Sequence, residues 1–259
     1  MTGIHIVNRR ASTSTNMMVM SLEAKDMALP TIEIYSDIHC PWTYLTIYRL
    51  RKVWPAYAGR LQVAWRALSL EYINKRGTPK PVLDVEIDLI RQIEPELPIQ
   101  RWPRPDWQWP VTFWPAFEAL ACAQAQGHAA AFAMSWALRH AFFAEGRCPS
   151  LRHELLDIAR TVAGEVALDL ARFEQDWDQG RYKGSVIVES RRGWHELRVA
   201  GSPTFVLPDG RQVADLGVGE ADIDEERGIV RSYTPYPGDP LDAIRGMLED
   251  ALRGAGGTP

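Results

Sequence analysis

The chemistry that this sequence suggests centres on Cys40, which is followed directly by Pro41. A β-branched segment ends just before this cysteine and a helix is predicted to begin just after it. Its sulfur should therefore lie beside unpaired backbone N–H groups and the positive end of a helix dipole. That position favours the thiolate and can lower a cysteine pKa from about 8.5 to about 3.5–7.5. A protonated His39 would add to the effect. On position alone, a buried cysteine that only packs is the competing interpretation.

A second segment whose residue types suggest a chemical role lies far along the chain, where Ser202 and Pro203 precede Thr204. A proline that begins a strand after Gly-Ser is a candidate for a cis peptide bond. Such a loop would matter to Cys40 only if the fold brought the two segments together.

The elements expected around these residues form an α/β arrangement. A strand at Thr31–Tyr35, a helix at Pro41–Val53 and a strand at Leu61–Trp65 make a βαβ unit, whose two strands should be parallel and adjacent. Thr204–Leu207 and Gln212–Leu216 are predicted to pair as a β-hairpin.

The composition changes between the βαβ unit and the predicted hairpin. Gly77–Pro115 is rich in proline and tryptophan and is predicted to be largely irregular. A loop rich in glycine and acidic residues is expected ahead of the last helix, and the run from Asp222 to Glu226 is interpreted as a solvated part of it. Helices are predicted at Phe117–Gln126, His128–Glu145, Leu151–Ala163, Leu168–Gln179, Ser185–Leu197 and Leu241–Leu252.

Two motifs in this order resemble those of the DsbA family of thioredoxin-fold proteins: Asp37–Tyr44 (DIHCPWTY) after a strand, and Gly201–Val206 (GSPTFV) before a hairpin. The segment Ala141–Arg147 is similar to the cytosolic branch of that family. The resemblance spans about residues 31–253. It implies an α/β thioredoxin-like fold with a large α-helical insertion, and a cis-proline loop against the active-site cysteine.

The resemblance also divides the chain. It implies a thioredoxin-like domain made of residues 31–76 and 198–253, and an inserted Trp/Pro-rich segment and helical domain at residues 77–197. Residues 1–30, which are rich in serine, threonine and methionine, are predicted to be a disordered leader.

One position departs from the family pattern. A dithiol member carries Cys-x-x-Cys, whereas Thr43 stands here in the second position. Cys40 could still form a mixed disulfide, but a thiol from elsewhere must release it. The Thr43 hydroxyl could donate to the Cys40 thiolate. Glutathione is the natural second thiol.

The resemblance therefore implies a thiol–disulfide oxidoreductase that acts through one cysteine and is coupled to glutathione. One alternative is a glutathione-dependent transferase or isomerase of aromatic small molecules, as in the related kappa-class glutathione transferases and 2-hydroxychromene-2-carboxylate isomerases. Those enzymes typically have serine at the position of Cys40. The other alternative is a non-catalytic thioredoxin-fold binding module. The implied catalytic residues are Cys40, Thr43, His39 and Pro203, and the implied substrate or glutathione contacts are Pro41, Trp42, Ser202 and Thr204.

The two remaining cysteines receive different interpretations. Cys122 lies in an alanine-rich helix and is expected to pack as a buried thiol. Cys148 lies in a loop beside Arg147, so a redox role stays open for it. The tryptophans between Trp102 and Trp114 are expected to pack so that they order the irregular connection to the helical block. The alternative is that they line an apolar cleft above Cys40.

Composition limits the partners. The chain has 259 residues with 29 Lys plus Arg and 33 Asp plus Glu, a formal net charge of −4, which does not favour nucleic acid. No apolar run is long enough for a membrane span. Three cysteines suit a reducing compartment, so the cytoplasm is expected. We expect no metal and no tightly bound cofactor, a disulfide-containing protein or small thiol as partner, and leave homodimerisation open.

Overall fold

The computed structural model of the protein describes residues 29–224 and 227–254. The leader predicted at residues 1–30 therefore falls almost wholly on residues outside the described ranges. Within those ranges, no helix combines the length and the apolar character that crossing a membrane requires.

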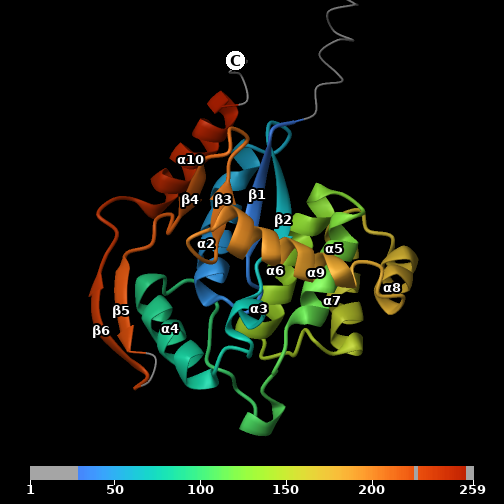
Figure 1. Ribbon diagram of the computed structural model, residues 1–259, viewed down its shortest axis with the longest axis horizontal. Coiled ribbons are helices and arrows are strands. Elements are labelled where there is room, and N and C mark those ends of the chain that lie inside the picture. The colour runs from blue at the N-terminus through green and yellow to red at the C-terminus, as the bar shows by residue number, and fades with distance from the viewer. Residues whose placement is uncertain (1–28, 225–226, 255–259) are drawn as a thin grey trace, which may run out of the picture.

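A four-stranded sheet in the order β2–β1–β3–β4 lies at the centre of the molecule (Figure 1). β1 runs parallel to β2 and antiparallel to β3, while β3 and β4 form an antiparallel hairpin. The predicted parallel pair and hairpin are both confirmed. In this register Thr204 pairs with Tyr35, near the end of β1 that leads to Cys40. The strands are β1 (Thr31–Ser36), β2 (Gln62–Ala67), β3 (Thr204–Val206) and β4 (Gln212–Ala214).

Helix α2 connects β1 to β2 and spans Pro41–Val53, as predicted. Its first-turn proline costs no helical hydrogen bond, because the N–H that proline lacks would have no partner there. The helix buries Tyr44 and Leu45 in the hydrophobic core. A short 3₁₀ turn, η1 (Trp54–Ala56), follows it, and α10 (Pro240–Gly254) packs along it.

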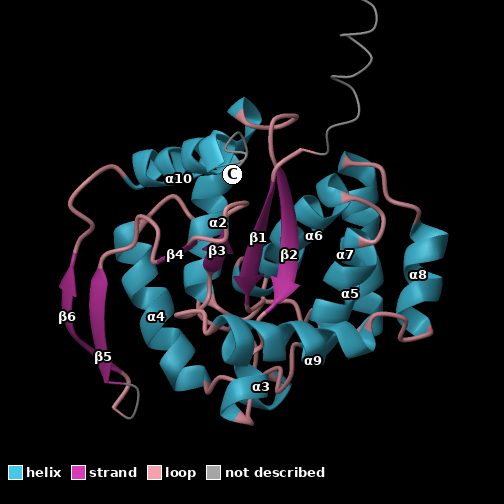
Figure 2. Cartoon of the chain, turned by 45° about the horizontal axis from the view of Figure 1, so that its top comes forward, coloured by secondary structure: helices cyan, strands magenta, loops and turns pink. Residues whose placement is uncertain are grey.

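A helical block separates β2 from β3 in the chain. Figure 2 shows α5, α6 and α7 gathered beside β2, and α5, α6 and α9 contact that strand directly. The block consists of α3 (Leu70–Asn74), α4 (Lys80–Ile93), the 3₁₀ turn η2 (Asp106–Gln108), α5 (Trp114–Gln124), α6 (His128–Phe143), α7 (Arg152–Glu165), α8 (Leu170–Asp178), α9 (Lys183–Arg191) and the π-helical turn η3 (Arg192–Leu197).

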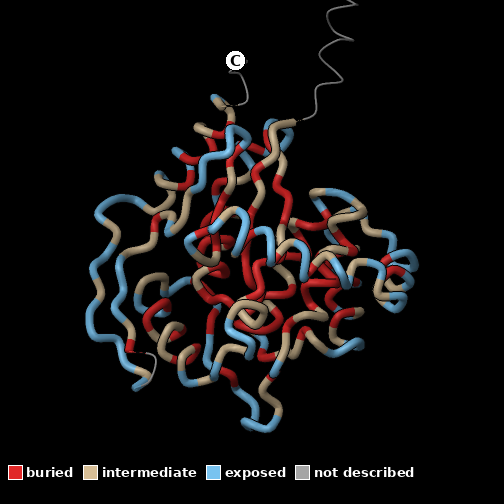
Figure 3. The backbone as a smooth tube through the Cα atoms, viewed as in Figure 1, coloured by how far each residue is buried: buried red, intermediate tan, exposed pale blue. Residues whose placement is uncertain are grey.

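One buried core extends from the sheet into the helical block (Figure 3). Ile34 of β1, Tyr44 of α2 and Phe143 of α6 all belong to it. The rings of Tyr44 and Phe143 stack with their centroids 5.2 Å apart. This packing fixes α6 against α2, and therefore against the beginning of α2 where Cys40 lies.

The prediction that Gly77–Pro115 is largely irregular is wrong for its first half, which contains the 14-residue helix α4. Pro81 lies in the first turn of that helix, where proline is tolerated. Leu83, Ile87 and Ile90 recur at helical spacing and are buried. The helix was not predicted because the many prolines of this segment indicate irregular structure.

The expected loop rich in glycine and acidic residues is also wrong, because it forms a second hairpin. Its strands β5 (Glu220–Asp224) and β6 (Ile229–Thr234) pair antiparallel, and Figure 1 shows them at the outer edge of the molecule beside α4. The acidic run from Asp222 thus begins within a strand, and residues 225–226 lie outside the described ranges. A hairpin exposed on both faces carries little apolar alternation, which is the signal that predicts strands.

Candidate active site

Cys40 occupies the residue immediately before α2, with an extended backbone conformation, φ −86° and ψ 116°. Its thiol donates a hydrogen bond to the carbonyl oxygen of Ser202 at 3.2 Å. The Ser202–Pro203 peptide bond is cis. The segment around Cys40 and the Ser202–Pro203 loop are therefore in direct contact. The cis peptide bond predicted for Pro203 is present.

Ser202 joins the loop before β3 to the start of α2. Its Oγ lies 2.9 Å from Oγ1 of Thr43 and accepts a hydrogen bond from the backbone N–H of Asp37 at 2.8 Å. Thr43 is fully buried, one helical turn after Cys40. The residue that replaces a second cysteine thus holds the proline loop in place.

Asp37 holds the turn between β1 and Cys40. Its carboxylate accepts hydrogen bonds from the backbone N–H of His39 at 2.5 Å and of Leu70 at 2.7 Å. Burial raises the pKa of Asp37 to about 6, although these two amides act in the opposite direction. The carboxylate ties the active-site turn to the segment that follows β2.

A buried cation, Arg139 of α6, lies beneath this turn and is 0% exposed. Its guanidinium donates to the Ser36 hydroxyl and to the Asp37 carbonyl oxygen, both at 2.9 Å, and to the hydroxyl of Ser135 at 2.7 Å. Burial lowers the pKa of Arg139 to about 10, while Asp37 and Cys40 favour its charged form through space. The helical block thus supplies a positive charge to the site.

The expectation of a depressed Cys40 pKa is wrong for this structure. Burial, and then the nearby Glu86 carboxylate, raise the pKa of Cys40 from an ordinary 9.0 to about 11. The hydroxyl and backbone N–H of Thr43 act to lower it, as predicted, but do not outweigh burial. Cys40 is 6% exposed, so its thiolate loses most of its hydration. The resting form is the thiol.

The expected role of His39 as a cation beside the thiolate is also wrong. Its side chain is buried, and its ring stacks on Phe113 with centroids 4.0 Å apart and contacts Trp109. Burial lowers the pKa of His39 to about 3, so the ring is neutral at physiological pH. His39 instead anchors the turn to the helical block through aromatic contacts.

A cavity of about 450 Å³ opens over the thiol. Its lining includes Cys40, Trp42 and Ser202, and also the charged residues Arg76 and Glu86. The indole N–H of Trp42 donates to Glu86 at 2.9 Å. Most of the exposed lining surface is polar, so the cavity suits a small polar molecule with charged groups.

The remaining predicted contacts divide into two groups. Pro41 and Trp42 line the cavity, whereas Thr204 is buried and donates to the Gly201 carbonyl oxygen at 2.7 Å, which shapes the loop behind it. In the described ranges, no group of three or more His, Cys, Asp or Glu side chains could hold a metal ion.

The other two cysteines lie apart from this cavity. Cys122 is buried in α5, and burial raises its pKa to about 12, which agrees with a packing role. Cys148 is half-buried and lines a different cavity together with Trp102, Trp107 and Trp109. The alternative that these tryptophans form a cleft above Cys40 is therefore wrong, since the two cavities share no lining residue.

Asp37, Arg76, Glu86 and Arg139 were not among the predicted site residues, although Asp37 begins the motif DIHCPWTY. Arg139 lies in the largely apolar helix α6, one turn after Ser135, so a single arginine among buried apolar residues could have indicated its role. Arg76 and Glu86 carry no such signal. Their place in the cavity depends on how α4 and the loop before it pack against Trp42.

Comparison with known proteins supports the fold. The model of a family described as DSBA-like thioredoxin domain matches residues 31–227. This match confirms the predicted thioredoxin-like α/β fold with a helical insertion. A search of curated proteins finds no match.

Several solved structures have a similar fold. The cytosolic disulfide reductase DsbM from Pseudomonas aeruginosa is 24% identical, and the alignment covers 86% of this chain and 98% of that chain with a TM-score of 0.58. The same reductase solved with GSH is 23% identical, with 86% and 99% covered and a TM-score of 0.58. A 2-hydroxychromene-2-carboxylate isomerase is 18% identical, with 86% and 94% covered and a TM-score of 0.52. At these identities the similarity shows a shared fold.

Proposed function

Because the chain belongs to the DSBA-like thioredoxin domain family, we propose that it is a thiol–disulfide oxidoreductase that works through Cys40 alone and takes its second thiol from glutathione. The observation that carries this proposal is the contact of the Cys40 thiol with the Ser202–Pro203 loop at 3.2 Å. Thr43 fills the second cysteine position, and within the described residues Cys40 is the only cysteine that lines the cavity.

The proposed reaction consists of two thiol exchanges. The Cys40 thiolate attacks a disulfide R–S–S–R′, forms Cys40–S–S–R and releases R′–S⁻, which takes up a proton. The thiolate of glutathione then attacks the sulfur of R, which yields R–S–S–G and restores Cys40. A second cycle, in which Cys40 attacks the glutathione sulfur, yields RSH and oxidised glutathione. Two glutathione molecules thus reduce one disulfide.

The cavity supports glutathione as the second thiol. Arg76 is exposed and lines it together with Asn74 and Thr78, so a cation and two polar side chains face the space beside the thiol. Glutathione carries two carboxylates, and guanidinium groups bind carboxylates well. The disulfide reductase DsbM, which has a similar fold, has been solved with GSH and is described as cytosolic. We extend the same ligand and compartment to this chain.

The protonated resting state sets a condition on this chemistry. With a Cys40 pKa of about 11, the thiolate fraction grows roughly tenfold per pH unit from neutral pH upward. A bound substrate that hydrogen-bonds to the sulfur, or that neutralises Glu86, would favour the thiolate. A thiol of high pKa is also a stronger nucleophile once it is deprotonated.

The same protonated thiol favours a second candidate function, a glutathione-dependent transferase or isomerase of aromatic small molecules. A Cys40 S–H that already donates to Ser202 could instead donate to the sulfur of a bound glutathione and stabilise its thiolate. The fold similarity to a 2-hydroxychromene-2-carboxylate isomerase is compatible with that role. In this case no covalent bond to Cys40 forms.

Turnover of 2-hydroxyethyl disulfide by reduced glutathione tests the proposal. Oxidised glutathione is followed by its NADPH-dependent reduction with an added reductase, for the parent chain, Cys40→Ser and Cys122→Ala. We expect Cys40→Ser to lose turnover above the uncatalysed rate. Cys122→Ala should retain it, because that thiol is buried away from the cavity. Equal turnover by the parent and Cys40→Ser would reject the proposal.

A further inference from the structure

A second cavity, of about 570 Å³, lies between the connection that contains η2 and the loop that leads into α7. In Figure 1 this connection is the green loop at the foot of the molecule. The volume falls within the range of small-molecule sites, roughly 300–1,000 Å³. The cavity shares no lining residue with the one over Cys40, and the two adjoin where the ring of Trp109 contacts His39.

The inner wall of this second cavity is aromatic and firmly packed. Trp102 is 7% exposed and stacks on Phe142 with centroids 5.4 Å apart. Trp109 meets Trp102 edge to face, at 5.9 Å and 87°. A planar ring placed against these indoles would make stacking or edge-to-face contacts with little reorganisation of the wall.

The rim of the cavity exposes large apolar side chains to solvent. Trp107 is 81% exposed, Val111 is 77% exposed and Leu151 is 47% exposed, and all three line the cavity. Apolar surface gathered around a concavity is typical of a ligand site, because a bound molecule removes it from water. The wall and the rim together select an aromatic ligand.

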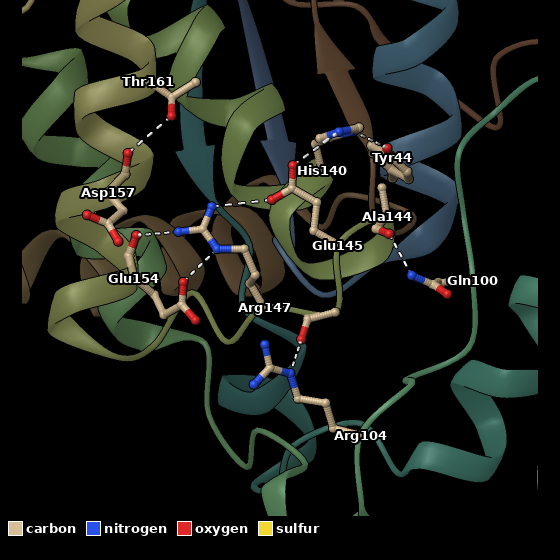
Figure 4. A network of polar contacts seen from close by, with 11 residues as sticks. Tyr44, Gln100, Arg104, His140, Ala144, Glu145, Arg147, Glu154, Asp157 and Thr161 are labelled. Atoms are coloured by element: carbon tan, nitrogen blue, oxygen red, sulfur yellow. Dashed lines mark hydrogen bonds and ion pairs between the residues drawn. The ribbon is translucent and has the colours of Figure 1, made fainter.

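The cavity lining includes one arginine and one glutamate, and only the glutamate forms an ion pair among the described residues. Arg104 lines it and donates through Nε to the Gly146 carbonyl oxygen at 2.7 Å (Figure 4), and in the described part of the chain no carboxylate pairs with this guanidinium. Glu154, the acidic residue of the lining, is paired with Arg147 at 2.6 Å. The Nη atoms of Arg104 therefore remain for an anionic group of the ligand, which a planar guanidinium binds well.

We propose that this cavity binds a planar aromatic carboxylate, with its ring against Trp109 and Trp107 and its carboxylate on Arg104. This inference does not depend on the thiol chemistry of Cys40. Cys148 also lines this cavity and is half-buried, so its reactivity can report on occupancy.

Calorimetric titration of the full chain with 2-naphthoate tests the proposal. We expect one site, with at least about fivefold weaker affinity for the uncharged analogue 2-naphthol. Trp107→Ala and Arg104→Gln should each weaken 2-naphthoate binding at least about fivefold. Both side chains are exposed, so thermal unfolding should be nearly unchanged. Arg76→Gln is the matched control, because that arginine lines the cavity over Cys40.

Alkylation of Cys148 by iodoacetamide, followed by peptide mass mapping, supplies a second readout. Saturating 2-naphthoate should slow this alkylation several-fold in the parent chain and not in Arg104→Gln. Three results would overturn the proposal: no heat of binding at millimolar 2-naphthoate, loss of binding in Arg76→Gln with retention in Arg104→Gln, or unprotected Cys148 at saturation.

Discussion

Cys40 keeps its proton at neutral pH because its sulfur is buried and a carboxylate lies near it. Burial is the larger cause of its raised pKa, and Glu86 is the second. Position at a helix N-terminus is therefore not sufficient to activate a cysteine when the sulfur is withdrawn from water. Thr43 and Ser202 offset this only in part.

At this scale, Glu86→Gln should lower the Cys40 pKa. The neutral amide removes the repulsion of the thiolate, while its oxygen can still accept the hydrogen bond from the Trp42 indole. We expect Cys40 to be alkylated by iodoacetamide about 2- to 10-fold faster at pH 8, measured by peptide mapping. Glu96→Gln is the control, since that side chain is 80% exposed and pairs with Lys52. A slower or unchanged rate in Glu86→Gln would contradict this role.

Thr43→Cys should restore a dithiol. Thr43 is fully buried one helical turn from Cys40, and cysteine is of similar size. Oxidised glutathione should then leave an internal disulfide instead of a stable adduct, which intact mass distinguishes directly. A persistent adduct on Cys40 in this variant would show that position 43 does not face the active-site sulfur.

At the scale of elements, three segments converge on the site: the start of α2, the loop before β3, and α6 of the helical block. Arg139 of α6 bonds to Ser36 and to the backbone of Asp37, so the insertion helps to hold the active-site turn. The position of the turn before Cys40 therefore depends on the helical block as well as on the sheet.

Arg139→Met tests this link between α6 and the site. The substitution leaves the buried Ser36 hydroxyl and Asp37 carbonyl oxygen without their donor, which should reduce the free energy of unfolding by about 2–4 kcal/mol. It also removes a positive charge near Cys40, so the thiol pKa should rise further. Urea unfolding and pH-dependent alkylation measure the two effects. Arg139→Lys should recover part of the alkylation rate, and a Cys40 pKa unchanged in both variants would contradict the electrostatic role.

The elements nearest the site were predictable from local signals. Alternation located β1, and Pro41 marked the start of α2. The helix α4 was not predicted, because the prolines of this segment indicate an irregular chain. Pro81, however, lies in the first turn of the helix, where proline is tolerated. The hairpin of β5 and β6 was not predicted, because its residues are mostly exposed and therefore do not alternate between apolar and polar.

At the scale of the whole molecule, the fold brings together Cys40 and Ser202, which are 162 residues apart in the chain, and forms two cavities with no common lining residue. The residues of the thiol site were predicted from motifs. Their ionisation was not, because the pKa values of Cys40 and His39 depend on burial by α4 and by the aromatic cluster around Phe113. Such burial depends on how distant elements pack together, which local sequence patterns do not specify.

Thiol exchange at Cys40 can be tested by the intact mass of the chain after incubation with oxidised glutathione between pH 7 and pH 10. We expect one glutathionyl group on the parent and on Cys148→Ser, and none on Cys40→Ser. The rate of addition should rise about tenfold per pH unit, because the Cys40 pKa is raised to about 11. An adduct that persists in Cys40→Ser, or a parent chain that remains unmodified across this pH range, would contradict thiol exchange at Cys40.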